Sequence, residues 1–490
     1  MPTPATALYT VAQTRAIDAW AISNAGIPGA TLMLRASAGA LAVLRQRWPA
    51  ARRIVVLCGL GNNGGDGFLL ATQARSQGLD ARVVALPGES RGDAVAARRG
   101  FLDGGGELVA AARDASLPAA DVYVDALFGS GLSRPLEGLP AVLVERLNAG
   151  AVPVLSLDVP SGLDADRGAC TGPAVCAAAT ACFVAWKRGL FTGLGTQCCG
   201  ETSLHTLQVP AAAYDAQRAD AELLQVAALP PRGADSHKGL YGHVLAIGGD
   251  RGMSGALRLC TEAALRCGAG LVSAATCADG AVLAAGRPEL MIHEVAGEAE
   301  LQPLLERSSV LALGPGLGQG DWGRTLWRAA LAAGKPIVVD ADGLNLLAAH
   351  PRTLPRAAVL TPHPGEAARL LGCSTGAVQA DRFSAVRELA SRFGVVAVLK
   401  GSGSLVAAPD GRVAVCPWGN PGMASGGMGD LLTGVIAALM AQRLEPWDAA
   451  CLGVGLHARA GDVAARTGQR GLLASDLLEP LRCLLNGIRP

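Results

Sequence analysis

Residues 54–67 read Ile-Val-Val-Leu-Cys-Gly-Leu-Gly-Asn-Asn-Gly-Gly-Asp-Gly, and this stretch indicates the fold. Its first five residues are an apolar run without polar alternation, which is typical of a strand buried on both faces of a parallel sheet. The glycine-rich segment after it predicts a tight turn into a helix. A strand that passes through such a turn into a helix is the repeating unit of an α/β fold.

Similar segments continue along the chain in two series. In the first we expect helices over 10–23 and 31–47 and strands over 54–58, 81–86, 121–126 and 152–157. In the second we expect strands over 244–247, 310–313, 336–340, 358–361 and 395–399 and a last long helix over 429–442. Between the series, residues 209–238 carry prolines and little strand signal, as a domain boundary would. We predict two tandem three-layer α/β domains, residues 1–215 and 223–490, the first with a doubly wound sheet.

The composition excludes several classes of protein. Of 490 residues, 50% are hydrophobic and 17% charged, so the chain can bury a large core and is not disordered. Its net charge of +1 gives no field that would attract nucleic acid or an anionic membrane. No apolar run reaches the roughly 18 residues of a transmembrane helix. Residues 1–11 lack the basic and apolar segments of a secretory signal.

The 13 cysteines are odd in number, scattered, and never spaced as C-x-x-C. Such usage favours reduced, buried thiols over a disulfide framework or a zinc site. We therefore expect a cytoplasmic protein.

The first glycine-rich loop allows two interpretations. Gly59, Gly61 and Gly64 fit the G-x-G-x-x-G pattern of a dinucleotide site. Asp66 argues against that site, because its carboxylate would lie beside the helix N-terminus where a pyrophosphate binds. In the other interpretation the glycines serve only the tight turn.

Polar residues also follow other predicted strands of the first series. Asp125 ends one strand, and Asp158 and Ser161 follow the next. The carboxyl ends of strands in a doubly wound sheet lie along one crevice, so we expect these residues to converge with Asp66. Their oxygens, with those of the asparagines in the loop, suit a polar substrate or a hard cation. A single strand-end aspartate is more often a cap or a turn former.

Residues 8 to about 210 resemble the N-terminal domain of the bifunctional NAD(P)H-hydrate repair enzymes. The resemblance lies in the stretches Tyr9–Asp18, Gly26–Gly29, Gly61–Gly67, Asp125–Gly129 and Asp158–Gly162. It implies a Rossmann-like epimerase that acts on the hydrated nicotinamide ring and binds a potassium ion.

The resemblance also implies roles for individual residues. Asn63, Asp125 and Ser161 would bind the potassium ion. The hydrated dinucleotide would contact Asn62, Asn63, Gly64, Gly65, Asp66, Gly129, Ser130, Gly131, Leu132, Ser133, Arg134, Pro135 and Asp158. Asp158 is the candidate general acid/base at the ring carbon that bears the hydroxyl.

The second series has its own glycine-rich loop, residues 419–430, directly before the last predicted helix. A loop of this kind at a helix N-terminus presents unpaired N–H groups that bind anions. Asp430 at the helix start could take the proton of a hydroxyl that attacks a phosphoryl group, or it could be only an N-cap. A Walker A loop is absent, because Pro336 follows Gly334 and Lys335.

Three other strand ends carry groups suited to a nucleotide cleft. Residues 399–404, Leu-Lys-Gly-Ser-Gly-Ser, can bind nucleotide through backbone and ammonium groups. Residues 361–366, Thr-Pro-His-Pro-Gly-Glu, hold an imidazole on a rigid turn, and residues 314–318 allow close backbone approach. Asp340 and Asp342 either lie near a metal-bound nucleotide or begin a helix.

Residues 223 to the C-terminus resemble the ribokinase-like dehydratase domain of the same family. The matching stretches are Ser236–Gly239, Gly248–Ala256, Ala264–Val272, Arg287–Met291, Thr361–Glu366 and Gly419–Asp430. The resemblance implies that Ala256, Gly318, His363 and Asp430 contact the hydrated coenzyme. It implies that Lys400, Gly401, Ser402, Gly403, Ser404 and Gly429 contact the adenine nucleotide.

We therefore predict a bifunctional enzyme that epimerises NADHX and NADPHX, the hydrated coenzymes, and dehydrates the S epimer with Mg²⁺ and ADP. The residues alone leave ADP and ATP open, and the resemblance favours ADP. The alternatives are a small-alcohol kinase of the ribokinase-like superfamily and an N-terminal half that only binds a nucleotide or a protein. We expect small-molecule partners, no nucleic acid, no membrane, and a homo-oligomer.

Overall fold

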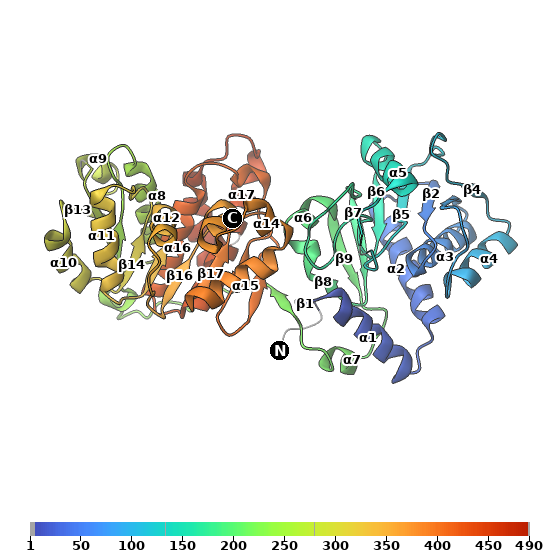
Figure 1. Cartoon of the computed structure of the whole chain (residues 1–490), viewed down its shortest axis with the longest axis horizontal. Helices are drawn as coiled ribbons and strands as arrows, with labels where there is room; N and C mark the ends of the chain where they lie inside the picture. Colours follow the sequence, from blue (N-terminus) through green and yellow to red (C-terminus); the bar gives the residue numbers. More distant parts are fainter. Residues whose placement is uncertain (1–4, 133, 279, 489–490) are drawn as a thin grey trace. The chain divides into compact units, whose positions relative to one another are not determined.

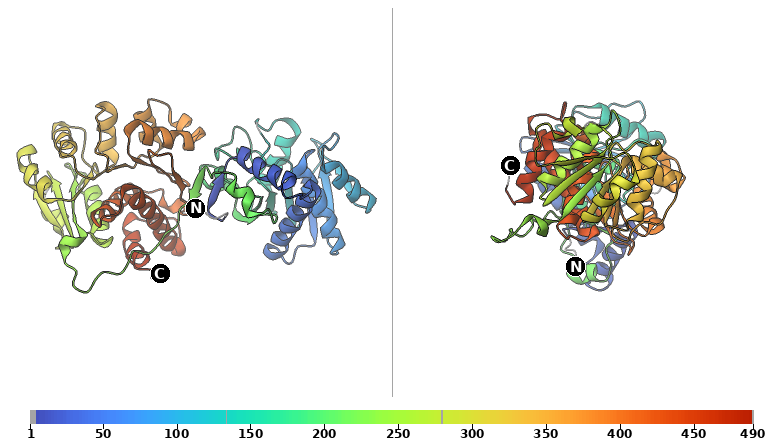
Figure 2. Two further views of the ribbon diagram at one scale, coloured as in Figure 1. Left: turned by 90° about the horizontal axis from the view of Figure 1, so that it is seen from below. Right: turned by 90° about the vertical axis from the view of Figure 1, so that its left-hand side faces the viewer.

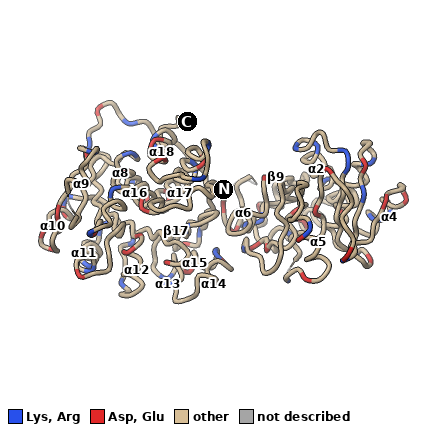
Figure 3. The backbone as a smooth tube through the Cα atoms, turned by 90° about the horizontal axis from the view of Figure 1, so that it is seen from above, with Lys and Arg blue, Asp and Glu red and all other residues tan. Residues whose placement is uncertain are grey.

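The computed structural model describes residues 5–132, 134–278 and 280–488 (Figure 1). The chain divides into two compact units, Met1–Glu222 and Leu223–Pro490. Each unit has its own sheet and its own hydrophobic core. Basic and acidic residues are interspersed over both units, in line with the small net charge (Figure 3).

The first unit contains a seven-stranded parallel sheet in the order β4-β3-β2-β5-β6-β7-β9. Its strands are β2 (Arg53–Cys58), β3 (Asp80–Ala85), β4 (Leu108–Ala110), β5 (Val122–Ala126), β6 (Val154–Leu157), β7 (Ala179–Phe183) and β9 (Glu201–His205). The strand order reverses between β2 and β5, so their connections leave in opposite directions. Ligands of doubly wound folds bind at the carboxyl ends of the strands at such a point.

Helices cover both faces of this sheet (Figures 1 and 2). They are α1 (Val11–Ser23), α2 (Gly29–Arg47), α3 (Asn62–Ser76), α4 (Ala94–Asp103) and α5 (Gly138–Ala149). Along β2, Ile54 and Val56 pack in one core with α2 and α3, whereas Val55 and Leu57 pack in another with α5. Because successive side chains point to opposite faces, a strand between two helical layers must be apolar throughout.

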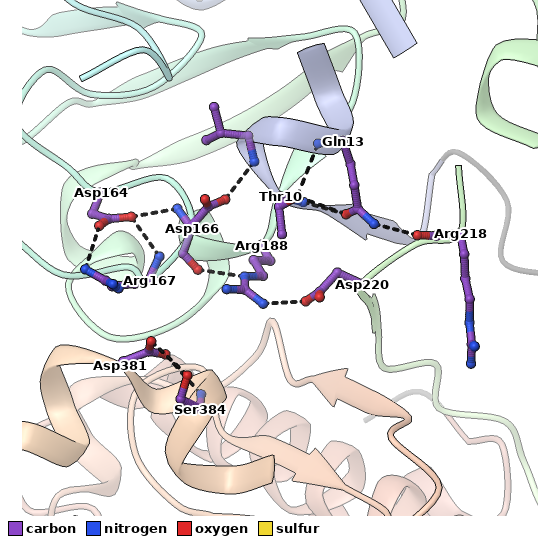
Figure 4. A network of polar contacts seen from close by, with 11 residues as sticks. Thr10, Gln13, Asp164, Asp166, Arg167, Arg188, Arg218, Asp220, Asp381 and Ser384 are labelled. Atoms are coloured by element: carbon purple, nitrogen blue, oxygen red, sulfur yellow. Dashed lines mark hydrogen bonds and ion pairs between the residues drawn. The ribbon is translucent and has the colours of Figure 1, made fainter. Parts of the chain in front are cut away.

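A smaller strand group holds the N-terminal segment. β1 (Ala7–Tyr9) pairs with β8 (Trp186–Lys187) and with β10 (Ala221–Leu223). Asp166 accepts a hydrogen bond from the amide of Val11 at 2.7 Å, and Arg188 donates to the Asp166 carbonyl and to Asp220 at 2.9 and 2.6 Å (Figure 4). These bonds connect Arg188, the neighbour of Lys187, to Asp220 and, through Asp166, to the start of α1.

The second unit is built on a nine-strand run in the order β13-β12-β11-β14-β15-β16-β17-β18-β19. Its strands are β11 (His243–Ile247), β12 (Leu271–Thr276), β13 (Met291–Glu294), β14 (Val310–Leu313), β15 (Ile337–Val339), β16 (Ala358–Leu360), β17 (Val396–Leu399), β18 (Leu405–Ala407) and β19 (Val413–Val415). All pairs from β13 to β17 are parallel, and β18 and β19 extend the sheet with antiparallel pairing.

Helices surround this sheet as well. They are α8 (Ser254–Arg266), α9 (Gly280–Ala284), α10 (Glu298–Arg307), α11 (Asp321–Ala332), α12 (Ala341–Ala349), α13 (Pro364–Leu371), α14 (Thr375–Ala380), α15 (Arg382–Phe393), α16 (Met428–Ala441), α17 (Pro446–Ala464) and α18 (Leu478–Leu485). α16 lies in the core of the unit, where it packs against α8, α17 and the sheet.

The prediction that the helix over 429–442 is the last long one is wrong, because α17 follows it with 19 residues. Three glycines within α17 weaken its intrinsic helical signal. Two of them allow close packing instead. A Cβ on Gly453 would lie 2.8 Å from Ile436 of α16, and one on Gly461 would lie 2.3 Å from the sulfur of Met423.

Two parallel-sheet units covered by helices confirm the predicted fold class. All 13 cysteines are free, and seven are buried, but Cys176 and Cys373 are exposed, so the expectation of buried thiols fails for those two. Among the described residues, no helix is long and apolar enough to cross a bilayer.

Candidate active sites

The first glycine-rich loop connects β2 to α3 and packs against the segment that follows β5. A Cβ on Gly59 would lie 1.9 Å from the carbonyl oxygen of Leu127, and one on Gly64 would lie 2.1 Å from the carbonyl oxygen of Gly59. These two glycines therefore allow the backbone to approach itself closely. Gly61 is the N-cap of α3 and faces open space, so it leaves room beside the helix N-terminus.

Asp125 and Ser161 converge at the end of β5, as predicted. The Asp125 carboxylate accepts bonds from the amide and hydroxyl of Ser161 at 2.9 and 2.6 Å and from the hydroxyl of Ser156 at 2.8 Å. The Ser161 hydroxyl also accepts a bond from the amide of Phe128 at 2.9 Å. Burial raises the pKa of Asp125, although the bonds from Ser161 oppose this. Asp125 and Ser161 therefore form a buried polar pair at the end of the strand.

Asn63 has an unusual amide side chain. Its oxygen and nitrogen are both buried, and neither has a hydrogen-bond partner in the described part of the chain. A Cβ on Gly129 would lie 3.3 Å from the Asn63 amide carbon and 3.1 Å from the Asp158 carboxylate, so these three residues meet. A buried unpaired amide costs free energy unless a ligand satisfies it. Asn63 is therefore available to a cation or a substrate.

Asp158 has a backbone conformation that few non-glycine residues adopt. Its φ angle is +64°, and strain of this kind is most often retained at functional sites. Its carboxylate forms an ion pair with Lys187 and accepts a bond from the amide of Ser130 at 3.1 Å. Burial alone would raise the pKa of Asp158, but the Lys187 ammonium and these hydrogen bonds outweigh it and lower the pKa.

Asp66 lies in the same cluster but in a different environment. Its side chain is buried and makes no hydrogen bond to any residue that the structure describes. Burial raises its pKa well above the ordinary value, and the charges of Asp158 and Asp18 add to the shift. Burial and the neighbouring negative charges therefore both disfavour the ionised form of Asp66.

Only part of the predicted substrate loop, residues 129–135, lies close to Asp158 and Asn63. Gly129 and Ser130 lie against Asp158, whereas Arg134 and Pro135 are exposed. Gly131 and Leu132 lie between them, and Ser133 is outside the described residues. In the glycine-rich loop Asn62 is exposed, while Gly64 and Gly65 are buried in the first turn of α3.

The second site centres on a buried ion pair between strand ends. Lys400, after β17, donates to the Asp340 carboxylate at 2.6 Å, and its nitrogen lies 3.9 Å from Glu366. Thr433 of α16 donates to the other Asp340 oxygen at 2.9 Å. Burial would raise the pKa of Asp340, but the Lys400 ammonium outweighs it and lowers the pKa. Burial raises the pKa of Glu366 to about 7, against the effect of Lys400.

Asp430 lies in the first turn of α16, beside this cluster. The N-cap of the helix is Gly427, with a φ of +88°, so the interpretation of Asp430 as a mere N-cap is wrong. A Cβ on the adjacent Gly429 would lie 3.0 Å from the Lys400 nitrogen, which shows how closely α16 approaches the pair. Burial raises the pKa of Asp430 to about 6, Asp340 adds to this shift, and Lys400 opposes it.

His363 is the N-cap of α13 and its tautomer follows from its contacts. The amide of Gly365 donates to the His363 Nδ1 at 3.0 Å, so Nδ1 is unprotonated and the neutral ring carries its proton on Nε2. Burial and the Lys400 charge lower the pKa of His363, which keeps the ring neutral. Its Nε2 lies 3.6 Å from Glu366, and more than half of the side chain is exposed. The half-exposed ring of His363 thus presents Nε2 as a hydrogen-bond donor.

The glycines after β14 adopt conformations that favour glycine. Gly316 and Gly318 have φ angles of +60° and +71°. A Cβ on Gly316 would lie 3.4 Å from the Cβ of Ala256, and one on Gly318 would lie 2.6 Å from the Asp250 carboxylate. The Gly318 amide donates to Asp342 at 2.9 Å. Asp342 lies in the first turn of α12 and Asp340 is its N-cap, so the helix-start interpretation is correct for both, while the Asp340 side chain binds Lys400.

Arg382 supports the predicted nucleotide loop from inside. Its guanidinium is buried and donates to the carbonyls of Leu399 and Lys400 at 3.3 and 3.2 Å. A Cβ on Gly401, whose φ is +131°, would lie 3.1 Å from this group. Ser404 closes the loop by donating to the Gly401 carbonyl at 2.9 Å. Asp381, which precedes Arg382, is the N-cap of α15. Its carboxylate accepts a hydrogen bond from the amide of Ser384 (Figure 4).

The sequence interpretation missed Lys187, Arg382 and Thr433. Lys187 could have been noticed from the composition, because only four of the 42 basic residues are lysines. Two of those four, Lys187 and Lys400, are the ones buried against aspartates at the two sites. Among the described residues, no three His, Cys, Asp or Glu side chains are arranged to hold a metal ion.

Comparison with known proteins gives matches to both units. Residues 244–482 match the family model described as NAD(P)H-hydrate dehydratase, and residues 29–189 match that of the YjeF-related protein N-terminus.

Relatives of known name match along the whole chain. The bifunctional NAD(P)H-hydrate repair enzyme Nnr of Coxiella burnetii is 45% identical over 98% of this chain and 100% of its own. The enzyme of the same name from Escherichia coli is 43% identical over 93% and 89%. Among solved structures, the ADP/ATP-dependent NAD(P)H-hydrate dehydratase of Bacillus subtilis, co-crystallised with ATP and Mg²⁺, is 30% identical over 52% of this chain and 93% of that one, with a TM-score of 0.47.

Proposed function

This chain belongs to the family of bifunctional NAD(P)H-hydrate repair enzymes, and on that basis we propose which residues perform its two reactions. The enzyme epimerises the R and S forms of hydrated NAD(P)H and dehydrates the S form to NAD(P)H at the expense of ADP, giving AMP and phosphate. Because the match covers 98% of the chain, both activities belong to it and the kinase alternative is not favoured.

The second unit is the dehydratase. Hydroxide is a poor leaving group at neutral pH, and transfer of a phosphoryl group from ADP converts the ring hydroxyl into a better one. Asp430 takes the hydroxyl proton as the oxygen attacks phosphorus, and the N–H groups of the first turn of α16 hold the phosphate charge. A pKa of about 6 leaves this carboxylate ionised at neutral pH and still able to accept a proton. The placement of Asp430 beside Lys400 and Asp340 is the observation that carries this proposal.

Other residues of this unit bind the two ligands. Ala256, Gly318 and His363 bind the hydrated coenzyme, with His363 donating from Nε2. Residues 400–404 and Gly429 bind ADP. A magnesium ion bound with ADP would offset phosphate charge, and Asp340 and Asp342, whose negative charges act on Asp430, are the candidate hard oxygen donors.

The first unit is the epimerase, with Asp158 as general acid/base at the hydroxyl-bearing ring carbon. The unsatisfied amide of Asn63 fits a potassium ion, which prefers neutral and anionic oxygens. Asp125 would supply the negative charge and Ser161 a hydroxyl oxygen, although these two bind each other here. The test is a potassium titration with Asn63→Ala and wild type, followed by epimerase rate and thermal unfolding. Potassium should stabilise only the wild type, and an equal stabilisation of both would exclude Asn63 as a ligand.

The fusion of both units lets one chain consume both epimers. In protein carrying Asp158→Ala, the S form in a racemic hydrate should disappear at the normal rate and the R form only at its spontaneous rate. Equally fast loss of both forms would contradict the assignment of Asp158.

We further propose a cytoplasmic location, which the 13 free thiols support. A homo-oligomer through the N-terminal helices is supported by Ile22 and Leu34, which are 43% and 51% exposed. Light scattering on the wild type and on Leu34→Glu tests this. A single monomeric mass for the wild type would refute it.

A further inference from the structure

The imidazole of His363 has a neighbour at each of its ring nitrogens, although its side chain is 52% exposed. Nδ1 accepts a hydrogen bond from the amide of Gly365 at 3.0 Å, and a carboxylate oxygen of Glu366 lies 3.6 Å from Nε2. An exposed histidine without such contacts samples several rotamers and both tautomers. These two contacts give the His363 ring one orientation and place its proton on Nε2.

Glu366 uses its two oxygens differently. Oε2 accepts a hydrogen bond from the amide of His363 at 2.7 Å and lies 3.9 Å from the nitrogen of Lys400. Oε1 is the oxygen that faces His363 Nε2, and its distance of 3.6 Å is too long for a hydrogen bond. The Glu366 side chain is only 6% exposed, so the protein fixes its position. Oε1 therefore attracts the Nε2–H group without binding its proton, and that proton is available to a ligand.

Gly365 allows the ring to lie close to the backbone of α13. A Cβ on this residue would lie 2.8 Å from Cε1 and 3.3 Å from Nδ1 of the imidazole. Gly365 does not have a positive φ, so its backbone conformation does not require glycine. The close approach of the His363 ring does require it, because any side chain at this position would displace the ring.

The charges around His363 determine how many N–H donors it has. Burial lowers its pKa, the cations Lys400 and Arg369 lower it further, and Asp340 opposes them. Burial raises the pKa of Glu366 to about 7, against Lys400 and Arg369 and with Asp340 adding to the shift. A neutral imidazole has a single N–H, and Nδ1 is already an acceptor. Nε2 is therefore the one ring donor of His363.

We propose that Glu366 and Gly365 are positioning residues for the hydrated coenzyme, because together they hold the His363 imidazole so that Nε2–H meets an acceptor oxygen of this ligand. The proposal rests on the assignment of His363 to the coenzyme site. A donor that is oriented before binding loses little conformational entropy when the ligand arrives. Loss of this orientation should therefore weaken binding of the coenzyme and leave binding of ADP unchanged.

The test uses the full-length protein at about pH 8, where Glu366 is ionised, with the S epimer and ADP as substrates. Glu366→Gln keeps an oxygen for the His363 amide, as glutamine does in other capping boxes, but directs an N–H donor toward Nε2. The KM for the coenzyme should rise about tenfold, as for one lost hydrogen bond. The kcat and the KM for ADP should stay within about threefold.

A double-mutant cycle shows whether Glu366 acts through His363. His363→Ala should raise the coenzyme KM about tenfold or more, because it removes the donor itself. In that background Glu366→Gln should add less than about a twofold change, since there is no imidazole left to position. Full additivity of the two effects would overturn the role of Glu366.

Gly365→Ala tests the position of the ring without changing any charge. The added Cβ displaces the imidazole, so the coenzyme KM should rise about tenfold. The melting temperature should not fall, because alanine favours a helix more than glycine does. Gly376→Ala in α14 is the matched control, since a Cβ there would meet only the Ser374 hydroxyl, at 3.8 Å. It should leave both KM values unchanged.

The outcomes separate this proposal from the assigned site. A normal coenzyme KM in His363→Ala would show that His363 is not in the site, and both assignments would be wrong. A raised KM in His363→Ala with normal values in Glu366→Gln and Gly365→Ala would keep the site and overturn the positioning roles. An equal rise in the KM for ADP would show that these residues only support the fold.

NMR of the full-length protein with isotope-labelled histidine gives a reading that does not need activity. The signals of His363 are those that disappear in His363→Ala. The wild type should show a single tautomer with the proton on Nε2, and Glu366→Gln should show a mixture of both tautomers. The same single tautomer in both proteins would contradict the role of Glu366.

Discussion

Each unit buries a lysine–aspartate ion pair at the ends of its strands. The two sites differ in whether the proposed reactive carboxylate belongs to that pair. In the first unit Lys187 pairs with Asp158 itself. In the second unit Lys400 pairs with Asp340, and Asp430 lies beside that pair without joining it. The pKa of Asp158 is lowered, although burial opposes this, whereas burial raises the pKa of Asp430 to about 6. A buried lysine–aspartate pair therefore lowers the pKa of the proposed reactive carboxylate in one site, whereas in the other site the reactive carboxylate lies beside the pair and has a raised pKa.

The chemistry of the two reactions accounts for the difference. In the epimerase, Asp158 acts as general acid/base at the ring carbon, and its ion pair with Lys187 lowers its pKa. In the dehydratase, phosphate charge gathers at the head of α16, and a carboxylate with a raised pKa accepts the hydroxyl proton there more readily. A buried lysine therefore does not by itself indicate which neighbouring acid is reactive.

The largest expected effect comes from replacing Asp430, the proposed reactive carboxylate beside the Lys400–Asp340 pair. Asp430→Asn should lower the dehydratase rate by about 100-fold to 10,000-fold, because the amide cannot take the hydroxyl proton. The epimerase rate of the same protein should not change. Recovery of NADH absorbance from the S epimer with ADP measures the first, and loss of the R epimer the second. An undiminished dehydratase rate would contradict the assignment of Asp430 as the general base.

Breaking the second pair should be costly to stability. Lys400→Met leaves Asp340 buried without its cation, and we expect the free energy of unfolding to fall by about 3–5 kcal/mol. Urea titration measures this. The double variant Lys400→Met with Asp340→Asn should recover part of the loss, because no buried charge is left unpaired. A double variant less stable than the single one would show that the pair is not the source of the effect.

The pH dependence should distinguish the two carboxylates. The dehydratase must lose about tenfold in rate per pH unit below about pH 6, because its base becomes protonated there. The pKa of Asp158 is lowered, so its own protonation reaches the epimerase only at more acid pH. Rates at pH 5 and pH 7 for the two reactions, measured on one preparation, test this. If both rates fell over the same acid pH range, the proposed difference in pKa between Asp158 and Asp430 would be wrong.

Lys238→Met should have the smallest effect and is the matched control for Lys400→Met. Lys238 is an exposed lysine, so Lys238→Met should change the free energy of unfolding by less than about 0.5 kcal/mol. Both reaction rates should be those of the wild type. Urea titration beside the Lys400→Met variant gives the comparison, and a loss of similar size would mean that the methionine substitution itself is harmful.

Much of the fold follows from local sequence patterns. The apolar runs of β2 and β14 are buried on both sides, and such runs are strands by necessity once helices cover both faces. β9 and β19 are short or partly polar and have no comparable signal. α17 was missed because its glycines weaken its helical pattern, and packing against α16 outweighs that weakness.

The sites divide in the same way. Strand-end positions indicated Asp125 and Ser161 as polar groups at the edge of a sheet, and the glycine-rich loop indicated Asp430 at the start of a helix, because both signals depend on local order along the chain. The pairs Asp158–Lys187 and Asp340–Lys400 join residues 29 and 60 positions apart. No local pattern specifies such a pair, since it depends on how the loops fold over the strand ends.

Asp430 is carried by a helix that has little contact with water. From Leu431 to Ala441 every residue of α16 is buried, between α8, α17 and the sheet. Amide protons in such a segment exchange with deuterium only when the surrounding domain opens as a whole. Dehydratase activity should therefore persist through fraying of the outer helices and vanish together with the slowest-exchanging amides.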